Sequence, residues 1–340
     1  MSLRKKWISG PAFTRFKKIL PPLSDTERQA MEAGSVWWDG ELFSGKPNWS
    51  TLLNYGPVAL TTQEQHFLDN EVATLLTLLD DYQIVHHEQE LPEPVWDYLK
   101  QQGFFSLIIP KAYGGKEFSA YANSTIVARI ASRSVSAAVT VMVPNSLGPG
   151  ELLMRYGTAE QQQYWLPGLA SGKEVPCFAL TGPEAGSDAG AIPDRGVVCE
   201  QEYQGKTTLG IRLNWDKRYI TLAPRATVLG LAFKLYDPEQ LLGETQALGI
   251  TCALIPTSHP GVKVGDRHSP MGLAFLNGTT QGQDVFIPLD WIIGGPDYAG
   301  KGWRMLVECL SAGRGISLPA LGTASGHLAL RSSGAYAYVR

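Results

Sequence analysis

The stretch FALTGPEAGSD, residues 178–188, holds the most informative pattern in the chain. It continues an apolar, β-prone run from Val175 that predicts a buried strand. The strand ends in a glycine-rich loop, where backbone N–H groups can approach a ligand closely because glycine carries no Cβ. The Thr181 and Ser187 hydroxyls and the Asp188 carboxylate add polar groups. The residues alone leave two interpretations open: a cradle for a phosphorylated or heteroaromatic ligand, and an ordinary surface loop.

Short apolar runs separated by turns follow residue 175, whereas helical spacing dominates before it. No helical pattern of about ten residues interrupts these runs, which predicts an antiparallel sheet or barrel rather than a parallel βαβ sheet. The sequence lacks the GxGxxG fingerprint of a Rossmann site. The predicted strands span residues 175–181, 207–213, 216–222, 226–235, 249–256 and 283–288.

Two helix start signals precede this β region. Residues 24–27 (SDTE) follow a Pro-Pro pair, and residues 61–65 (TTQEQ) contain a capping-box pattern. Helical spacing returns after Gly302. The sequence therefore predicts an α+β fold with helices on both sides of a β region.

Composition narrows the class of protein. The 340 residues are 44% hydrophobic and 18% charged, which is typical of globular domains, and the net charge of -3 does not favour nucleic-acid binding. The sequence has no apolar run of transmembrane length and no apolar signal-peptide segment. The four cysteines are widely spaced and form no CxxC pair, so we expect buried free thiols in a reducing cytosol. His86 and His87 are neighbours that would point about 100° apart in a helix, and we expect no metal site.

Residues 1–20 combine lysines and arginines with aromatic and aliphatic residues, and they contain no acidic residue. This pattern suits an anionic membrane surface, with rings at the headgroup level and cations at the phosphates. A basic tail that docks on the protein's own acidic surface is an equally good interpretation. We therefore expect a cytoplasmic protein, with peripheral contact at the inner face of the plasma membrane as a hypothesis.

Three motifs in a fixed order resemble those of the acyl-coenzyme A dehydrogenases. They are FALTGPEAGSD, the stretch NWDKRYIT at residues 214–221, and the helical segment from Gly300 that ends in YAYVR at Arg340. The resemblance covers roughly residues 63–340. The first sixty residues resemble only the long, membrane-associated FadE-type bacterial branch of this family.

The resemblance implies an α+β multidomain fold. We expect a helical N-terminal domain, a middle antiparallel β-barrel or β-sandwich domain, and the start of a C-terminal helical bundle. The sequence stops within a helical pattern, which predicts that this bundle is incomplete. The expected ranges are 1–60 for the basic segment and an irregular arm, 61–176 for the helical domain, 177–298 for the β domain with the flavin motif, and 299–340 for the incomplete bundle.

The resemblance also implies an FAD site and an acyl-coenzyme A site. Residues Ser187 and Arg314 would contact the acyl-coenzyme A, although Ser311 stands where the family often has an acid. Arg340 would reach the flavin pyrophosphate of a neighbouring subunit. Tyr219 stands where the family usually has tryptophan, which leaves the ring contact open. The residues expected to hold the flavin ring are Phe178, Ala179, Leu180, Thr181, Tyr219, Ile220 and Thr221.

The implied reaction is α,β-dehydrogenation of a medium- or long-chain fatty acyl-CoA in fatty-acid β-oxidation, an oxidoreductase step of lipid metabolism. A glutamate removes the α-proton, the β-hydrogen leaves as hydride, and electrons pass to an electron-transfer flavoprotein. A minority of the family carry this glutamate just before the helix arginine, where this chain has Gly313, and Glu308 is six residues from Arg314. The base is therefore expected beyond residue 340.

Two alternatives stay open from the sequence. One is an acyl-CoA oxidase of the same fold, which would pass electrons to oxygen and release peroxide. The other is a truncated, non-catalytic fragment that binds acyl-CoA or a membrane surface. A homo-oligomer is expected for the full-length enzyme, because subunit interfaces close the flavin site in this family.

Overall fold

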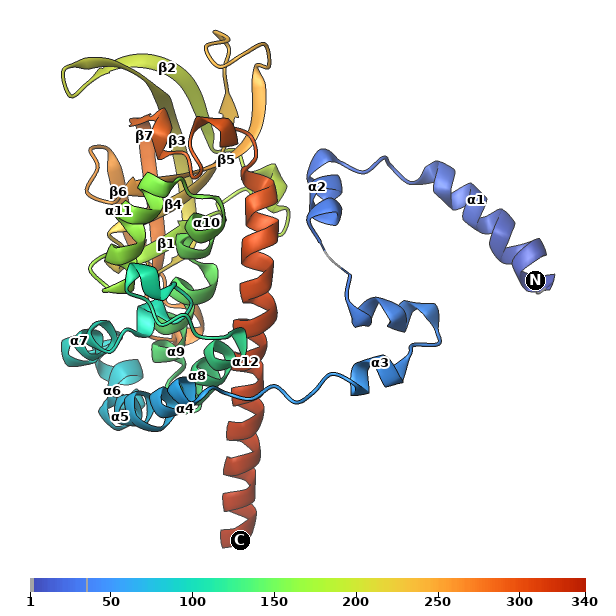
Figure 1. The fold of residues 1–340 in the computed structure, drawn as a ribbon, viewed down its shortest axis with the longest axis vertical. Helices are drawn as coiled ribbons and strands as arrows, with labels where there is room; N and C mark the ends of the chain where they lie inside the picture. Colours follow the sequence, from blue (N-terminus) through green and yellow to red (C-terminus); the bar gives the residue numbers. More distant parts are fainter. Residues whose placement is uncertain (1–2, 35) are drawn as a thin grey trace.

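The computed structural model describes residues 3–34 and 36–340. Figure 1 shows an N-terminal arm, a layer of short helices, a β-sheet beside that layer, and one long helix that runs along both. Helices thus precede and follow the sheet, and the predicted α+β class is confirmed. Among the described residues, no helix has the length and the apolar character needed to cross a membrane.

The helices before the sheet are short, and both predicted start signals are confirmed. The Ser24 hydroxyl accepts a hydrogen bond from the Glu27 N–H while the Glu27 carboxylate accepts one from the Ser24 N–H, and Thr61 and Glu64 repeat this capping box. The α-helices are α1 Gly10–Ile19, α2 Asp25–Ala33, α3 Trp49–Leu53, α4 Thr62–Phe67, α5 Ala73–Leu78, α6 Asp81–Gln83, α7 Glu93–Gln101, α8 Ala120–Ala131, α9 Val135–Met142, α10 Pro149–Tyr156 and α11 Ala159–Ala170, and the π-helical turn η7 Val143–Leu147 lies between α9 and α10.

The sheet has seven strands in the order β1-β4-β2-β3-β7-β6, with β5 also paired to β4. Most pairs are antiparallel, as predicted, but β1 and β2 each pair with β4 in parallel. Apolar runs alone do not encode strand direction, so the sequence could not predict these two parallel pairings. The strands are β1 Pro176–Ala179, β2 Arg195–Tyr203, β3 Lys206–Thr221, β4 Val228–Tyr236, β5 Ala247–Pro256, β6 Val262–Arg267 and β7 Asn277–Pro288.

The strand predictions were wrong at four places. One is β7, which begins at Asn277, six residues before its predicted start. Strands β2 and β6 were missed because neither contains a long apolar run: only Gly196 and Val198 of β2 are buried, and β6 has no buried residue. The predicted strands 207–213 and 216–222 form one strand, β3, which continues through a register shift between Leu213 and Trp215. A strand can thus continue, through an irregularity in its pairing, across polar residues that resemble a turn in the sequence.

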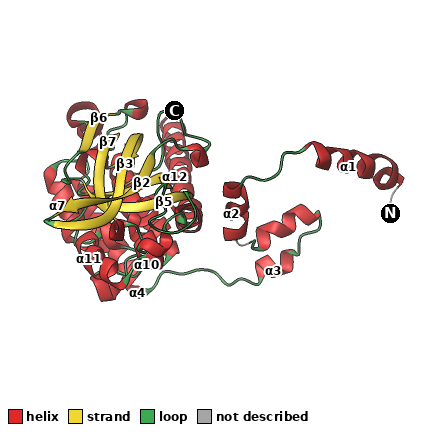
Figure 2. Cartoon of the chain, turned by 90° about the horizontal axis from the view of Figure 1, so that it is seen from above, coloured by secondary structure: helices red, strands yellow, loops and turns green. Residues whose placement is uncertain are grey.

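Helix α12, Gly302–Val339, is the longest element of the described chain. Its 38 residues span about 57 Å at 1.5 Å per residue. Its first half packs against the body, whereas its last turns project beyond the short helices (Figure 1). The arm that carries α1, α2 and α3 lies beside the body, with α2 nearest to it and α1 farthest from it (Figure 2).

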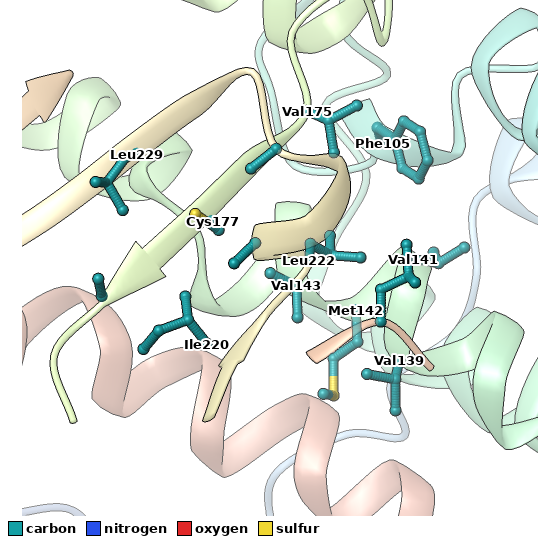
Figure 3. Close-up of a cluster of buried hydrophobic side chains, with 14 of the residues drawn as sticks. Phe105, Val139, Val141, Met142, Val143, Val175, Cys177, Ile220, Leu222 and Leu229 are labelled. Carbon is teal, nitrogen blue, oxygen red and sulfur yellow. The ribbon is translucent and has the colours of Figure 1, made fainter. Parts of the chain in front are cut away.

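The main hydrophobic core joins the helical layer to the sheet. Figure 3 shows Val143 and Met142 of the helical layer beside Cys177 of β1 and Ile220 of β3. Burial of these side chains fixes the end of β1 against η7. Of the four cysteines, which are all free thiols, Cys199 is only half-buried, so the expectation of buried thiols holds for the other three.

Candidate functional site

A cavity of about 200 Å³ lies where β1, β3, η7 and α12 meet. Strand β1 and its loop supply one wall, β3 a second, and α12 a third. Three sequence motifs that are far apart in the chain thus converge on one space. The lining residues are Val143, Leu147, Phe178, Leu180, Thr181, Tyr219, Ile220, Thr221, Leu310, Arg314 and Leu318.

A glycine on the neighbouring strand makes room for the wall formed by Phe178. Phe178 pairs with Gly230 of β4, and a Cβ at Gly230 would lie 2.5 Å from the Phe178 ring. Any side chain at position 230 would therefore displace this ring. Ala179 is fully buried and does not line the cavity, so it packs beneath the wall.

A buried ion pair ties the end of β1 to β3. The Lys217 ammonium is fully buried, pairs with the Asp194 carboxylate, and donates a hydrogen bond of 2.7 Å to the Leu180 carbonyl. The Arg218 N–H donates to the Thr181 carbonyl at 3.1 Å. Burial lowers the pKa of Lys217, whereas the Asp194 charge opposes this shift. These two bonds hold the backbone carbonyls of Leu180 and Thr181. They do not involve the Thr181 hydroxyl, which has no hydrogen-bond partner among the described residues.

The bulge in β3 directs Tyr219 away from the sheet. The ladder to β7 shifts between Lys217 and Ile220, and Tyr219 adopts a φ of 59°, which is unusual for a residue with a side chain. Tyr219 is 54% exposed, and its ring lies 4.7 Å from the His268 ring, measured between centroids. Strain at one residue beside a cavity is common at functional sites.

Two buried polar atoms beside Tyr219 have no partner within the described chain. They are Nε of Arg218 and Nε2 of His268. The Arg218 guanidinium carbon lies 5.2 Å from the Tyr219 ring centroid. Sequence reasoning missed both residues: Arg218 could have been found as the neighbour of a motif tyrosine, but His268 carries no sequence signal.

Helix α12 contributes Leu310, Arg314 and Leu318 at four-residue spacing, so they share one helix face. Gly313 lets α12 pack very closely against η7, because a Cβ at position 313 would lie 1.9 Å from the Ser146 carbonyl oxygen. A glutamate could not occupy position 313 in this packing. The structure thus gives a physical reason for the glycine at this position.

A small buried polar cluster, which the sequence did not reveal, fixes α12 to η7. The Ser146 hydroxyl contacts the Ser317 hydroxyl and accepts a hydrogen bond of 3.2 Å from the Asn123 amide. Ser146 and Ser317 are 171 positions apart in the sequence. Only the folded chain brings them together.

Besides Ala179, two residues of the expected site lie outside the cavity. Ser187 is exposed in the loop after β1. Arg340 lies at the far end of α12, where its guanidinium donates to the Tyr336 hydroxyl at 2.6 Å. Its expected contact with a neighbouring subunit stays a prediction.

Glu308 lies in a separate polar network. Its carboxylate pairs with Arg155 at 2.6 Å and Arg304 at 2.8 Å and accepts a hydrogen bond from Tyr156. Burial raises the pKa of Glu308, but the Tyr156 hydrogen bond and the two arginines outweigh burial, so the net pKa is lowered. Burial and the bond to Glu308 raise the pKa of Tyr156 to about 12. A carboxylate that is tied up in this way is a poor proton acceptor.

No cluster of three His, Cys, Asp or Glu side chains within the described ranges could hold a metal ion.

The comparison with known proteins identifies the family. The model of the acyl-CoA dehydrogenase N-terminal domain matches residues 59–173, and that of the middle domain matches residues 177–285. The two matches cover most of the chain, and it therefore belongs to the acyl-CoA dehydrogenase family. Residues 3–58 precede the first match.

The chain is also similar to individual proteins and to solved structures. The chain is 57% identical to Protein HemX of Proteus mirabilis over 104 residues, which are 31% of this chain and 61% of the relative. It is 30% identical to the caffeyl-CoA reductase-Etf complex subunit CarC of Acetobacterium woodii, over 77% of this chain and 64% of the relative. The structure of butyryl-CoA dehydrogenase from Megasphaera elsdenii has the same fold, with a TM-score of 0.69, 21% identity, and coverage of 83% of this chain and 70% of that one.

The chain spans less than two thirds of the length of these curated relatives.

Proposed function

We propose that the chain forms the flavin- and substrate-binding part of an FAD-dependent acyl-CoA dehydrogenase, an oxidoreductase that acts on a CH–CH bond. The observation that carries the proposal is the shared cavity. It gathers Phe178, Leu180 and Thr181 from one motif, Tyr219, Ile220 and Thr221 from a second, and Arg314 from a third. Family membership supplies the reaction class.

The residues of the cavity fit the ring system of a flavin. Aliphatic and aromatic side chains form most of its walls, and Thr181 adds a hydroxyl to the lining. The buried Arg218 Nε, beside Tyr219, has no partner among the described residues. Unpaired polar groups beside an apolar space suit a heteroaromatic ring with polar edges. At about 200 Å³, the space is smaller than the roughly 300–1,000 Å³ of pockets that enclose a whole drug-sized ligand. It would thus hold one ring system of FAD rather than the whole cofactor.

The substrate class is a fatty acyl-CoA, for which we propose a medium or long chain and a role in fatty-acid β-oxidation. Arg314 would face the substrate from α12, and Ser187 would contact it from the loop after β1. FAD, when bound, supplies the hydride acceptor for the β-hydrogen. The apolar walls would exclude water from the reacting carbons, which makes the α-proton easier to remove.

The proton-accepting carboxylate is not part of the cavity wall. No aspartate or glutamate lines the cavity among the described residues, Glu308 is engaged by two arginines, and position 313 cannot accommodate a side chain. We place the base outside the described residues.

We propose an electron-transfer flavoprotein as the electron acceptor. The name of the caffeyl-CoA reductase-Etf complex subunit describes an Etf complex for that relative. An acyl-CoA oxidase would instead reduce oxygen. Oxygen-dependent peroxide release on addition of substrate would favour the oxidase.

The flavin site can be tested with a matched pair of variants and a fluorescence titration of FAD. Thr181→Ala removes the hydroxyl that we assign to the flavin edge, and one hydrogen bond of this kind is worth roughly 0.5–1.5 kcal/mol, or about twofold to twelvefold in Kd. Thr207→Ala makes the same change at an exposed position of β3 and should leave the Kd unchanged. Equal FAD affinities for both variants would contradict the assignment of Thr181.

A second part of the proposal concerns the membrane. Helix α1 and the turn before it are exposed, and Trp7, Phe13, Phe16 and Ile19 are each at least 66% exposed. Basic residues interleave with them, which suits peripheral contact with an anionic lipid surface. Replacing Phe13 and Phe16 by serine should weaken binding to anionic vesicles. Unchanged binding would favour a tail that docks on protein.

A further inference from the structure

The N-terminal arm contacts α12 through α2. Within residues 3–20 every residue is exposed except Gly10, which is half-buried. In α2 the half-buried residues are Thr26, Gln29, Ala30 and Ala33, which repeat at helical spacing. Helix α2 therefore turns one continuous stripe towards the body, and its contacts with α12 agree with this direction.

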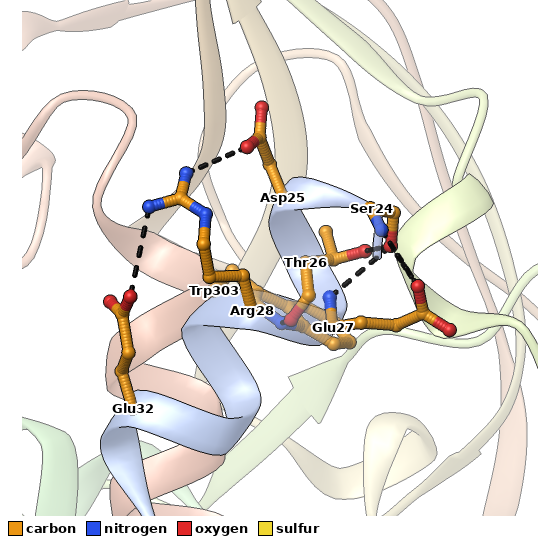
Figure 4. Close-up of polar contacts among 7 residues, drawn as sticks. All are labelled: Ser24, Asp25, Thr26, Glu27, Arg28, Glu32 and Trp303. Carbon is orange, nitrogen blue, oxygen red and sulfur yellow. Dashed lines mark hydrogen bonds and ion pairs between the residues drawn. The ribbon is translucent and has the colours of Figure 1, made fainter. Parts of the chain in front are cut away.

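Helix α2 is bonded to the first turn of α12. The indole N–H of Trp303 donates a hydrogen bond of 2.8 Å to the Thr26 carbonyl (Figure 4). Gln29 and Glu32 of α2 line a cavity together with Lys301, which caps α12, and Arg304 of α12. Two separate parts of α2 thus face the beginning of α12.

Thr26 of α2 also lies beside the loop after β1. A Cβ placed on Gly190 would lie 3.2 Å from Thr26 Oγ1 and 3.3 Å from Thr26 Cγ2. Gly190 lies three residues after Ser187. Thr26 therefore contacts α12 with its carbonyl and the loop with its side chain.

Local interactions within α2 keep Thr26 in a helical turn. The capping box of Ser24 and Glu27 closes the first turn, and Arg28 pairs with Asp25 at 2.7 Å (Figure 4). The exposed ion pair adds little stability, so the cap is the main local determinant.

We propose that α2 is a positioning element of the acyl-CoA site. It holds the loop of residues 182–190, which carries Ser187, at a fixed separation from the turn of α12 that leads to Leu310 and Arg314. This inference rests on the proposed function for its role towards acyl-CoA, but not for the contact itself. Helix α2 precedes residue 59, so it lies outside both family domains that match the chain.

The contact can be tested by hydrogen–deuterium exchange of the whole chain without ligand. Ala30→Glu places a charge in the half-buried stripe, and Met31→Glu places the same charge at the adjacent position, which is 69% exposed. Trp303→Phe removes the indole donor but retains a ring. Ala30→Glu and Trp303→Phe should speed exchange in residues 182–192 and 302–306, while Met31→Glu should not. The amides of β3 and β7 should stay protected in all three, which checks the fold.

Equal exchange in Ala30→Glu and Met31→Glu would overturn the proposed contact. The second measurement is the Kd of octanoyl-CoA by calorimetry. We expect Ala30→Glu to weaken binding by about threefold to tenfold and Met31→Glu to leave it unchanged. A looser loop with unchanged octanoyl-CoA binding would overturn the positioning role. Failure of the wild-type chain to bind octanoyl-CoA would contradict the proposed function, and the exchange result would still decide whether α2 holds the loop.

Discussion

The two halves of α12 belong to one helix but differ in what stabilises them. Residues 302–324 include side chains that are almost fully buried, such as Cys309 and Ser317, whereas every residue from 325 to 340 is exposed. Both halves contain glycine, which disfavours a helix by about 1 kcal/mol at each position relative to alanine. Packing against the body therefore stabilises the first half, which is also the half that forms a wall of the cavity.

The largest expected contrast between the halves comes from two glycine substitutions. Gly313→Ala forces a Cβ against the Ser146 carbonyl, whereas a Cβ at Gly326 meets no atom within 4 Å. We expect Gly313→Ala to lower the free energy of unfolding by about 3 kcal/mol or more. Gly326→Ala should leave it unchanged or raise it by up to about 1 kcal/mol. Urea denaturation measures both values, and a stable Gly313→Ala variant would show that α12 does not pack this closely on η7.

Two leucines give the next contrast. Leu310 is 4% exposed and Leu330 is 74% exposed. Leu310→Ala should cost about 2–5 kcal/mol, because it removes buried methyl groups and leaves a cavity. Leu330→Ala should change stability by no more than about 0.5 kcal/mol. Similar losses in both variants would mean that the outer half of α12 is covered in solution.

A smaller effect is expected from the serine contact between α12 and η7. Ser317→Ala leaves the buried Ser146 hydroxyl with only Asn123 as a partner, which should cost about 1 kcal/mol. Ser333→Ala changes an exposed residue of the outer half and serves as the control. A thermal unfolding midpoint that is equal in both variants would argue against the hydroxyl contact.

Acid should affect the two halves differently. The pKa of Glu308 in the folded protein lies below its ordinary value of 4.5. Its stabilising contribution is therefore complete above the unfolded-state value and is lost as pH falls through the folded-state value. We expect Glu308→Gln to show a smaller loss of stability than the wild type between about pH 5 and about pH 3. Parallel curves of stability against pH for the two proteins would contradict this expectation. The outer half of α12 contains no aspartate or glutamate, so it should not contribute to the pH dependence.

The features that the sequence predicted well are local or belong to a motif. The capping boxes at Ser24 and Thr61 depend on residues three positions apart, and the structure has both. The residues of FALT and YIT were predicted as one site, and most of them line one cavity. Their roles towards a cofactor stay predictions.

The missed features depend on long-range packing. Strand β6 has no buried residue, so its hydrophobic pattern carried no signal. The bond between Trp303 and Thr26 joins residues 277 positions apart, and no local rule predicts it. The reason for glycine at position 313 became visible only when α12 was seen against Ser146.

The most direct test of the cavity assignment is hydrogen–deuterium exchange of the wild-type chain with and without saturating FAD. We expect slower exchange with FAD in residues 178–183, 217–222 and 310–318, which surround the cavity. A second cavity, of about 640 Å³, is lined by residues that include Gln161, Trp165 and Trp291 and serves as an internal comparison. Protection confined to residues 158–165 and 290–296, or no protection at all, would show that FAD does not bind in the cavity between β1, β3, η7 and α12.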